Sequence, residues 1–410
     1  MNIFLLNEYF PPDTSATAKM AALVVGELTK RHRVTVLCGR PSYDPSERHP
    51  FYLLRRERQG NLIVERVGSI TYPRFRMRQR LLNYLSYLVL AVPRALMIPA
   101  DVVLSMTDPP IMGIAAAFVA MLKRRPFVYN IRDMYPDMAL GGEIMRPSRF
   151  VNVWEKLHRW ALRRAAKVIV LGEDMRERIV AKGVDPSRVV VVRDGVPIPE
   201  VLPPVGHPVA QEVRCGFPFV LLHAGNLGFY GAWATLVKAA RELAHHGVGL
   251  VFVGEGAKRA EIEAAAQGSP AVRFLPFWPP EHIPHVLAAG DLHIVTIRRG
   301  LEGVVVPSKL YGILAAGRPV LAVAPEESDV ARIVRRAGCG VVADPDNAAA
   351  VVAAVRGLLA DRQKLTEMGA RARAIAAEYE RQKHLSLLVQ AVESAVGTGQ
   401  GSGWITSEPQ

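Results

Sequence analysis

Short apolar runs alternate with amphipathic stretches along almost the whole chain, and this alternation restricts the fold more than any other feature. The runs 2–6 (NIFLL) and 33–39 (RVTVLCG) are typical, and the stretches 17–32 and 230–247 carry the apolar spacing of helices. Strands that alternate with helices form parallel sheets that are buried on both faces, so an α/β fold is predicted. Strands are predicted at 2–6, 33–39, 62–67, 101–106, 126–131, 167–172, 188–195, 219–226, 249–256, 272–277, 291–297, 319–324 and 339–343.

The alternation restarts after a segment dense in proline and glycine, which predicts a linker near 197–217. With 410 residues and 50% hydrophobic content, the chain can bury two cores. Two doubly wound parallel-sheet domains are therefore expected to face a cleft at the carboxyl ends of their strands. The expected divisions are 1–200, 201–375, a C-terminal helix at 376–396 that packs toward the first domain, and a disordered tail at 397–410.

The charge balance favours an anionic ligand or surface. The chain has 51 basic and 38 acidic residues, a formal charge of +13, which suits phosphorylated ligands, anionic lipid or nucleic acid. Its three cysteines (Cys38, Cys215 and Cys339) are far apart and form no CxxC pair, which argues against a disulfide scaffold or a zinc site and fits a reducing cytoplasm. The first residues read as a strand and carry no signal-peptide pattern.

Three loops that follow predicted strands are candidates for ligand contacts. In 7–19, Asp13, Thr14 and Ser15 lie at a helix start, where an ordinary cap remains the alternative reading. The loop lacks GxGxxG, which argues against a dinucleotide-binding oxidoreductase. In 223–236, glycines allow backbone N–H groups to approach a phosphate. In 252–263, Glu255 could accept hydrogen bonds from ribose hydroxyls, and its alternative role is to stabilise the start of the helix through the helix dipole. The candidates in these two loops are Gly225, Asn226, Leu227, Gly228, Glu255 and Gly256.

The segment 303–324 (GVVVPSKLYGILAAGRPVLAVA) places a lysine at a helix start, where a cation is unfavourable unless an anion binds there. Pro307 suits the first helical position, and the N–H groups of Ser308 and Lys309 are expected to point into the cleft. An exposed Lys309 would then hold a diphosphate, although a solvated lysine is the alternative. Neighbouring candidates are Leu310, Arg298 and Glu302.

Together, these segments resemble glycosyltransferase family 4, of the GT-B fold, and its WbuB-like subgroup of bacterial polysaccharide-assembly enzymes. The resemblance covers nearly the whole chain and rests on 8–19 (EYFPPDTSATAK), 129–137 (YNIRDMYPD), 224–228 (AGNLG), 253–263 (VGEGAKRAEIE) and 306–322 (VPSKLYGILAAGRPVLA). It implies two Rossmann-like domains and retaining transfer from a nucleotide-diphosphate sugar, with a UDP-sugar expected. It also implies no cofactor, no essential metal, and an acceptor sugar linked to polyprenyl diphosphate, in O-antigen, capsule or exopolysaccharide synthesis.

By this resemblance, Lys309 and the 225–228 loop would stabilise the leaving diphosphate, and the base would lie against Phe277 and Trp278. The chain departs from the family at Asn226, where many relatives have arginine, and at Gly312, where a glutamate usually holds the ribose. The first of the family's paired glutamates would fall at Val304, so Glu302 or Glu255 is expected to substitute.

Arg132 and Asp133 follow a predicted strand of the first domain and are expected to face the cleft. Asp133 could orient or deprotonate an acceptor hydroxyl, and its alternative role is to cap the next segment. Asp133, Lys309 and Arg132 are thus the predicted catalytic residues.

The segment 74–98 combines alternating arginines with an apolar stretch that Pro93 and Arg94 interrupt, which is too broken for a confident transmembrane helix. It suits an interfacial helix on an anionic membrane, with a core helix of the first domain as the alternative. The expected location is therefore cytoplasmic, at the inner face of the plasma membrane. A nucleotide-sugar epimerase is the alternative enzyme, and the absence of a recognisable module argues against nucleic acid as a partner.

Overall fold

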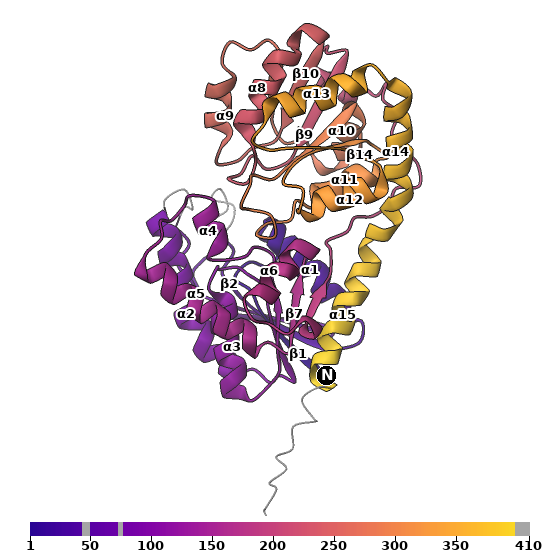
Figure 1. The fold of residues 1–410 in the computed structure, drawn as a ribbon. Helices are drawn as coiled ribbons and strands as arrows, with labels where there is room; N and C mark the ends of the chain where they lie inside the picture. Colours follow the sequence, from indigo (N-terminus) through magenta and orange to yellow (C-terminus); the bar gives the residue numbers. More distant parts are fainter. Residues whose placement is uncertain (43–49, 73–76, 398–410) are drawn as a thin grey trace, which may run out of the picture.

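The computed structural model describes residues 1–42, 50–72 and 77–397, which form two α/β domains, one above the other in Figure 1. The first sheet has the strand order β3-β4-β2-β1-β5-β6-β7-β8, and every pairing is parallel except that of β3 with β4. Its strands are β1 (Asn2–Leu6), β2 (Arg33–Gly39), β3 (Leu54–Gln59), β4 (Leu62–Val67), β5 (Val102–Ser105), β6 (Phe127–Asn130), β7 (Lys167–Val170) and β8 (Val189–Val191). The helices of this domain are α1 (Ala16–Thr29), α2 (Met77–Met97), α3 (Met112–Lys123), α4 (Asp137–Gly141), α5 (Arg149–Arg164) and α6 (Glu173–Ala181).

The second sheet is parallel throughout, with the order β11-β10-β9-β12-β13-β14. Its strands are β9 (Phe219–Ala224), β10 (Val248–Val253), β11 (Val272–Leu275), β12 (Leu292–Thr296), β13 (Val320–Val323) and β14 (Gly340–Ala343). Its helices are α7 (Pro208–Arg214), α8 (Trp233–Leu243), α9 (Arg259–Ala266), α10 (Ile283–Ala289), α11 (Lys309–Ala315), α12 (Asp329–Ala337) and α13 (Ala348–Leu359). The predicted doubly wound α/β class is therefore confirmed.

Two local predictions were wrong. Strand β3 was missed because all six of its residues (LRRERQ) are exposed, so it lacks the apolar alternation that marks a half-buried strand. The predicted linker 197–217 contains α7, whose residues Val209, Ala210 and Val213 pack against β10 and α10 of the second domain. The proline-rich composition concealed this helix, since Pro208 occupies its first turn, where proline is tolerated.

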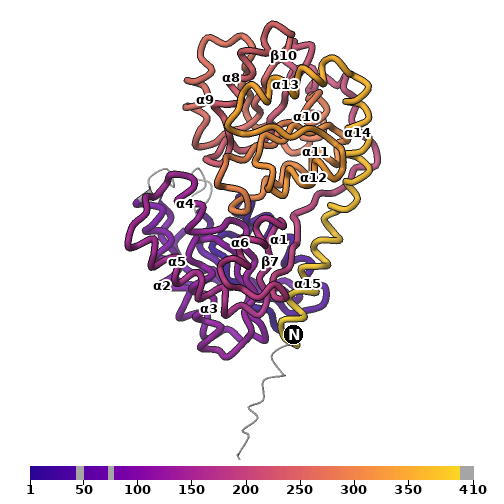
Figure 2. The backbone as a smooth tube through the Cα atoms, viewed as in Figure 1, coloured from indigo at the N-terminus to yellow at the C-terminus, as the bar shows by residue number. Residues whose placement is uncertain are grey.

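The C-terminal segment crosses back to the first domain. It comprises α14 (Arg362–Ala376) and α15 (Arg381–Gly397), separated by a short 3-10 turn at Ala377–Tyr379, so the helix expected at 376–396 begins at Arg381. Figures 1 and 2 show α14 beside the second domain and α15 running down along the first. Leu385, Leu388 and Val392 of α15 join the core formed by α1 and the first sheet. The predicted disordered tail lies outside the described residues from 398 onwards.

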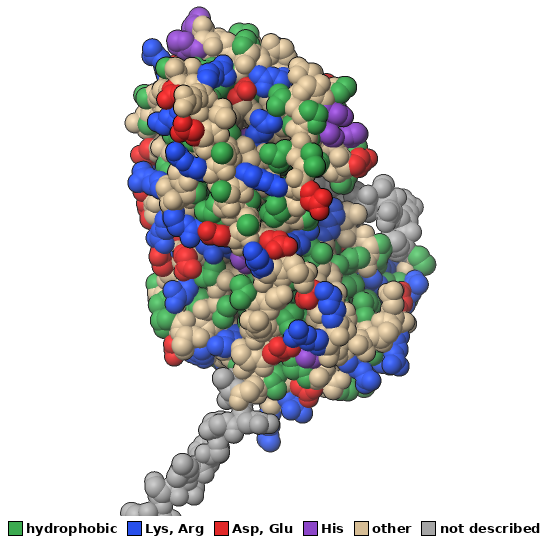
Figure 3. Space-filling view, turned by 90° about the vertical axis from the view of Figure 1, so that its right-hand side faces the viewer, with side chains coloured by type: hydrophobic (Ala, Val, Ile, Leu, Met, Phe, Trp, Pro, Cys, Tyr) green, Lys and Arg blue, Asp and Glu red, His purple; other side chains and the backbone are tan. Residues whose placement is uncertain are grey.

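The face that carries α14 and α15 has Lys and Arg side chains interspersed with Asp and Glu (Figure 3). Within the described ranges, the structure has no helix that combines the length and the apolar character needed to cross a bilayer.

The two domains are joined by apolar and polar contacts that fix the position of the cleft. Met134 and Ile131 of the first domain share one core cluster with Leu301 and Val304 of the second, and the Met134 N–H donates to the Val304 carbonyl at 3.1 Å. This arrangement brings the carboxyl end of β6 against the loop that precedes α11.

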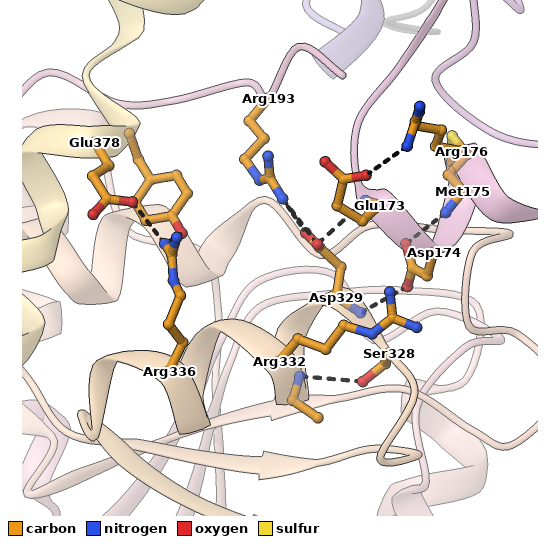
Figure 4. Close-up of polar contacts among 12 residues, drawn as sticks. Glu173, Asp174, Met175, Arg176, Arg193, Ser328, Asp329, Arg332, Arg336 and Glu378 are labelled. Atoms are coloured by element: carbon orange, nitrogen blue, oxygen red, sulfur yellow. Dashed lines mark hydrogen bonds and ion pairs between the residues drawn. The ribbon is translucent and has the colours of Figure 1, made fainter. Parts of the chain in front are cut away.

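A polar cluster at the same interface joins α6 to α12 (Figure 4). The Asp329 N–H at the start of α12 donates to Asp174 at 2.9 Å, and the Glu173 N–H at the start of α6 donates to Asp329 at 3.2 Å. Each helix start is thus capped by a carboxylate from the other domain. Arg193 donates to both oxygens of Asp329, at 2.8 and 3.1 Å, and both aspartates are at least 95% buried.

Candidate functional site

A cavity of about 520 Å³ lies between the two domains, at the carboxyl ends of their strands. Its polar side chains are few, and aliphatic and aromatic side chains form most of the wall, as is usual for a small-molecule site. The lining residues are Asp133, Met138, Val196, Ala224, Gly225, Asn226, Tyr230, Val253, Phe277, Ile283, Leu287, Val305, Val306, Pro307, Ser308, Lys309 and Gly312.

Lys309 is the first residue of α11, and its ammonium group lies in the cavity wall. The residue is only partly exposed, whereas the sequence predicted an exposed lysine. Its Nζ is 2.8 Å from Nε2 of His223 and 5.8 Å from the centre of the Tyr230 ring. Burial lowers the pKa of Lys309 to about 7. A bound anion would offset this desolvation and favour the charged form.

His223 is a residue of the site that sequence reasoning missed. It is the fifth residue of β9 and is fully buried, so its place in a predicted strand marked it as part of the core. Burial and the adjacent Lys309 hold the pKa of His223 well below its ordinary value, so the ring is neutral and one nitrogen can accept a hydrogen bond from the ammonium group. No local sequence signal reveals the pair, because the two residues are 86 positions apart.

The glycine-rich loops after β9 and β10 are hydrogen-bonded to each other. The N–H groups of Gly225 and Leu227 donate to the carbonyls of Val253 and Glu255, each at 2.8 Å. These two donors are therefore occupied, which corrects the expectation that the whole 225–228 loop offers N–H groups to a phosphate. Gly254, at φ +145°, makes the close approach possible, since a Cβ there would lie 2.2 Å from the Gly225 carbonyl oxygen.

The other predicted residues of these loops divide between the cavity and the core. Asn226 lines the cavity, whereas Leu227 is fully buried in the core of the second domain. The Gly228 carbonyl accepts a hydrogen bond from the Trp233 indole at 2.7 Å. A Cβ at Gly256 would lie 2.4 Å from the Leu227 carbonyl oxygen, so this glycine serves the packing of the two loops.

Asp133 reaches the cavity from the first domain, beyond the end of β6, as the sequence predicted. Its N–H donates to the Thr107 hydroxyl at 3.4 Å. Burial, and to a lesser degree the nearby Asp108, raises the pKa of Asp133 to about 6. The group is thus ionised at neutral pH and titrates close to it, which suits a general base.

Arg132 was expected to face the cleft beside Asp133, but the structure places its side chain elsewhere. Its guanidinium forms a two-pronged ion pair with Asp194, with Nη2 at 2.6 Å from Oδ2. It lies among the residues between β6 and α15, and outside the lining of the interdomain cavity. Successive residues beyond a strand can point to opposite sides, so one of the pair faces the ligand site and the other a structural contact.

Arg298 and Glu302 were expected at the donor site, but both side chains form contacts between the domains. Arg298 bonds to Glu143 at 3.1 Å and to the Gly141 carbonyl at the end of α4. Glu302 accepts from the Gly300 N–H at 2.7 Å and lies 3.6 Å from Arg178 of α6.

Glu255 also lies outside the cavity, because it pairs with Arg259 one helical turn along the chain. Neither Glu255 nor Glu302 lines the cavity, where a substitute for the family's ribose-holding glutamate was expected. At Gly312 the wall is open, since the nearest atom to a Cβ there would be Leu287 Cδ1 at 3.8 Å.

The predicted residues of the first loop serve local structure. Ser15 caps α1 by accepting from the Ala18 N–H at 3.0 Å, and Asp13 accepts from the Ser42 N–H at 2.9 Å. Thr14 is exposed, and none of Asp13, Thr14 and Ser15 lines the cavity.

The start of α11 lies two residues later than expected. Ser308 occupies the cap position and Pro307 precedes it, yet both line the cavity. Leu310 is 1% exposed and belongs to the core. Phe277 lines the cavity and is 54% exposed, whereas Trp278 turns to α10 and contacts His282.

Two family models match the chain, one in each domain. The model described as "Glycosyl transferase 4-like domain" matches residues 16–195, and the one described as "Glycosyl transferases group 1" matches 218–361. The two matches follow the division of the structure into two sheets.

Curated sequences and solved structures give consistent matches. The "Probable glycosyltransferase WbjE" of Pseudomonas aeruginosa is 25% identical over 61% of the chain and 64% of its own length, so the match spans less than two thirds of that relative. WcaI of Escherichia coli (strain K12) is 30% identical over 33% of the chain and 34% of its own length. The crystal structure of HepE from Anabaena with UDP is 18% identical, with a TM-score of 0.66 over 96% of the chain and all of HepE, a likeness of fold.

Proposed function

Because the chain belongs to the glycosyltransferases of GT-B fold, we propose that it moves a sugar from a nucleotide-diphosphate sugar to an acceptor hydroxyl. One observation carries the proposal: the Lys309 ammonium of the second domain and the Asp133 carboxylate of the first line the same cavity. A cation for the leaving diphosphate and a base for the acceptor are two groups that promote this reaction.

The donor is proposed to lie across the second domain. Lys309, Ser308 and Asn226 would contact the diphosphate, and the nucleoside would lie along the apolar wall of Phe277, Ile283 and Leu287. A UDP-sugar is the proposed donor, supported by HepE, whose structures were solved in complex with UDP and with UDP-glucose.

The acceptor is proposed to enter from the side of Asp133. The bond between the anomeric carbon and the diphosphate oxygen breaks, and a bond to the acceptor oxygen forms on the same face of the sugar, which retains the configuration. Asp133 takes the acceptor proton, and Lys309 offsets the charge that develops on the diphosphate. Transfer is proposed to need no cofactor and no metal.

The proposed role is in bacterial O-antigen, capsule or exopolysaccharide assembly, with an acceptor sugar carried on polyprenyl diphosphate. WcaI is named for colanic acid biosynthesis, and WaaG, a structural neighbour with a TM-score of 0.64 at 16% identity, for lipopolysaccharide biosynthesis. The proposed location is cytoplasmic, peripheral at the inner face of the plasma membrane.

The test incubates the full chain with a panel of nucleotide sugars and saccharide acceptors, and follows nucleoside diphosphate release and product mass. Acceptor-dependent release, lost in Asp133→Asn and Lys309→Met and unaffected by EDTA, is expected. NMR of the anomeric proton then reports the configuration of the product. Interconversion of the donor sugar without an acceptor would contradict transfer, and loss of activity with EDTA would contradict the metal-free mechanism.

A further inference from the structure

An apolar groove of about 670 Å³ lies between α2, α3 and α5 of the first domain, on the opposite side of that domain from α15 in Figure 1. Every side chain that lines it is apolar or aromatic. The lining residues are Leu88, Val92, Ile111, Ile114, Ala115, Phe118, Phe150, Val153, Trp154, Leu157 and Trp160.

The groove exposes large apolar side chains to solvent. Phe150, Val153 and Leu157 of α5 are 63%, 55% and 45% exposed, and Phe118 of α3 is 43% exposed. Positions 150, 153 and 157 follow one helical face, so they form a continuous stripe. A contiguous exposed patch of this kind marks an interaction surface.

The stripe continues onto α2, which the sequence had marked as a membrane-binding segment. Tyr87 and Ala91 of this helix are buried in the core, whereas its outer face exposes Leu81, Leu85 and Val89, the last at 70%. The alternative reading of α2 as a core helix is therefore correct for one face only. Arg74 and Arg76, part of the predicted basic stretch, lie outside the described residues.

Basic side chains border the groove on α5 itself. Trp160 lines the groove and also a surface hollow formed with Lys156, Arg159, Arg163 and Arg164. The Arg164 guanidinium lies 5.8 Å from the centre of the Trp160 ring. A tryptophan between an apolar surface and a basic cluster is typical of the boundary between acyl chains and headgroups.

We propose that the α2–α3–α5 face, comprising this groove and its basic border, binds an anionic phospholipid bilayer. Acyl chains cover the groove, and Lys156, Arg163 and Arg164 contact the headgroup phosphates. Helix α5 carries both an apolar and a cationic surface. These two surfaces match the acyl-chain layer and the headgroup layer of a lipid bilayer. This inference rests on the proposed peripheral location and refines it. It assigns membrane binding to a face formed by three helices, whereas the sequence predicted the segment 74–98 alone.

The face also lies near Asp133, which lines the cavity. Trp154 lines the groove and stacks on Tyr135, with ring centres 5.9 Å apart, and Tyr135 follows Asp133 by two positions. A bilayer bound here therefore lies beside the side of the cavity from which the acceptor is proposed to enter.

Flotation of the full-length chain with vesicles tests the proposal. Vesicles of phosphatidylcholine with phosphatidylglycerol are compared with vesicles of phosphatidylcholine alone. The variants are Val153→Ser/Leu157→Ser in the groove and Arg163→Glu/Arg164→Glu at its border. The matched controls are Val201→Ser, which is 82% exposed elsewhere, and Lys238→Glu/Arg31→Glu, which makes the same charge change on other surfaces.

The wild type and both controls are expected to float with the anionic vesicles, and each test variant to bind at least about tenfold more weakly. Unchanged circular dichroism melting establishes that the variants are folded. Equal binding by all proteins overturns the proposal. The proposal is also overturned if the test variants lose self-association, measured by sedimentation, but keep vesicle binding. A second copy of the chain would then cover this face.

Transfer to a water-soluble acceptor, measured without vesicles, separates this inference from the proposed function. If the wild type binds vesicles but transfers no sugar, the lipid-binding proposal is supported and only the proposed enzymatic function is contradicted.

Discussion

Lys309 lies 2.8 Å from His223, so the cation in the interdomain cavity rests against a buried, neutral imidazole and has no carboxylate in that contact. The arrangement leaves the positive charge of the lysine available to a ligand. It also makes the protonation of Lys309 sensitive to what the cavity holds, because burial alone lowers its pKa to about 7.

UDP affinity is expected to fall as pH rises through about 7 in the wild type, because the ligand requires the ammonium form of Lys309. Binding above this pH should take up a proton, which calorimetry in buffers of different ionisation enthalpy measures. Lys309→Arg should remove the pH dependence, and Lys309→Met should weaken binding at every pH. Lys238→Met, on an exposed helical surface, is the control. Wild-type affinity that is constant with pH would exclude Lys309 from the diphosphate site.

The same lysine affects stability in the absence of ligand. Its pKa is about 7 in the folded chain and near 10.5 in the unfolded one, so the unfolded chain binds more protons between these values. The contribution of Lys309 therefore makes the free energy of unfolding rise with pH across this window. Urea unfolding at several pH values should show a smaller rise in Lys309→Met, and identical slopes would contradict the lowered pKa.

Asp133→Asn is expected to lower kcat by about 10²–10⁴-fold and to leave UDP affinity nearly unchanged, since the residue faces the acceptor side. The wild-type rate should fall as pH drops through about 6, where the Asp133 carboxylate takes up a proton. Because Asp108 raises this pKa, Asp108→Asn should move the acid limb to lower pH. An unshifted limb in Asp108→Asn, or a limb that persists in Asp133→Asn, would assign the titration to another group.

Two helical glycines should respond in opposite ways to alanine. At Gly312 the nearest atom to a Cβ would be 3.8 Å away, so Gly312→Ala should stabilise the protein by about 0.5–1 kcal/mol. At Gly369 of α14 a Cβ would lie 2.6 Å from the Gly317 carbonyl oxygen, so Gly369→Ala should destabilise the protein.

Gly312→Glu should raise the affinity for UDP relative to 2′-deoxy-UDP, as measured by calorimetry. Equal affinity for the two nucleotides would exclude the ribose from this part of the cavity.

Asp329→Ala should destabilise the protein by roughly 3–5 kcal/mol, because it leaves the Arg193 guanidinium and the Glu173 N–H without their partner at the domain interface. Asp361→Ala is the matched control, since Asp361 also caps a helix start but is exposed and lies within one domain. It should cost about 1 kcal/mol. Chemical unfolding measures both, and similar losses would mean that the contacts across the interface contribute little.

The residues that could be predicted from sequence are those whose role follows from local pattern. Lys309 at a helix start, Asp133 beyond a strand and the glycine at 225 are recognisable because helix starts and strand ends of a parallel sheet gather at one edge. Arg132, Arg298 and Glu302 were placed wrongly for the opposite reason. Their charged groups lie several bonds from the backbone, and the partners that orient Arg298 and Glu302 are Glu143 and Arg178, 155 and 124 positions away.

The amino-acid sequence alone determined the two α/β domains, since buried parallel strands need continuous apolar runs and the helices that cover them need periodic ones. Only the tertiary structure decided which charged side chains line the cavity and which hold the domains together. It also decided that His223 supports Lys309 and that α5 completes the apolar face with α2 and α3. Such pairings depend on how distant elements pack, and packing follows from the shape of the whole core rather than from any local stretch of residues.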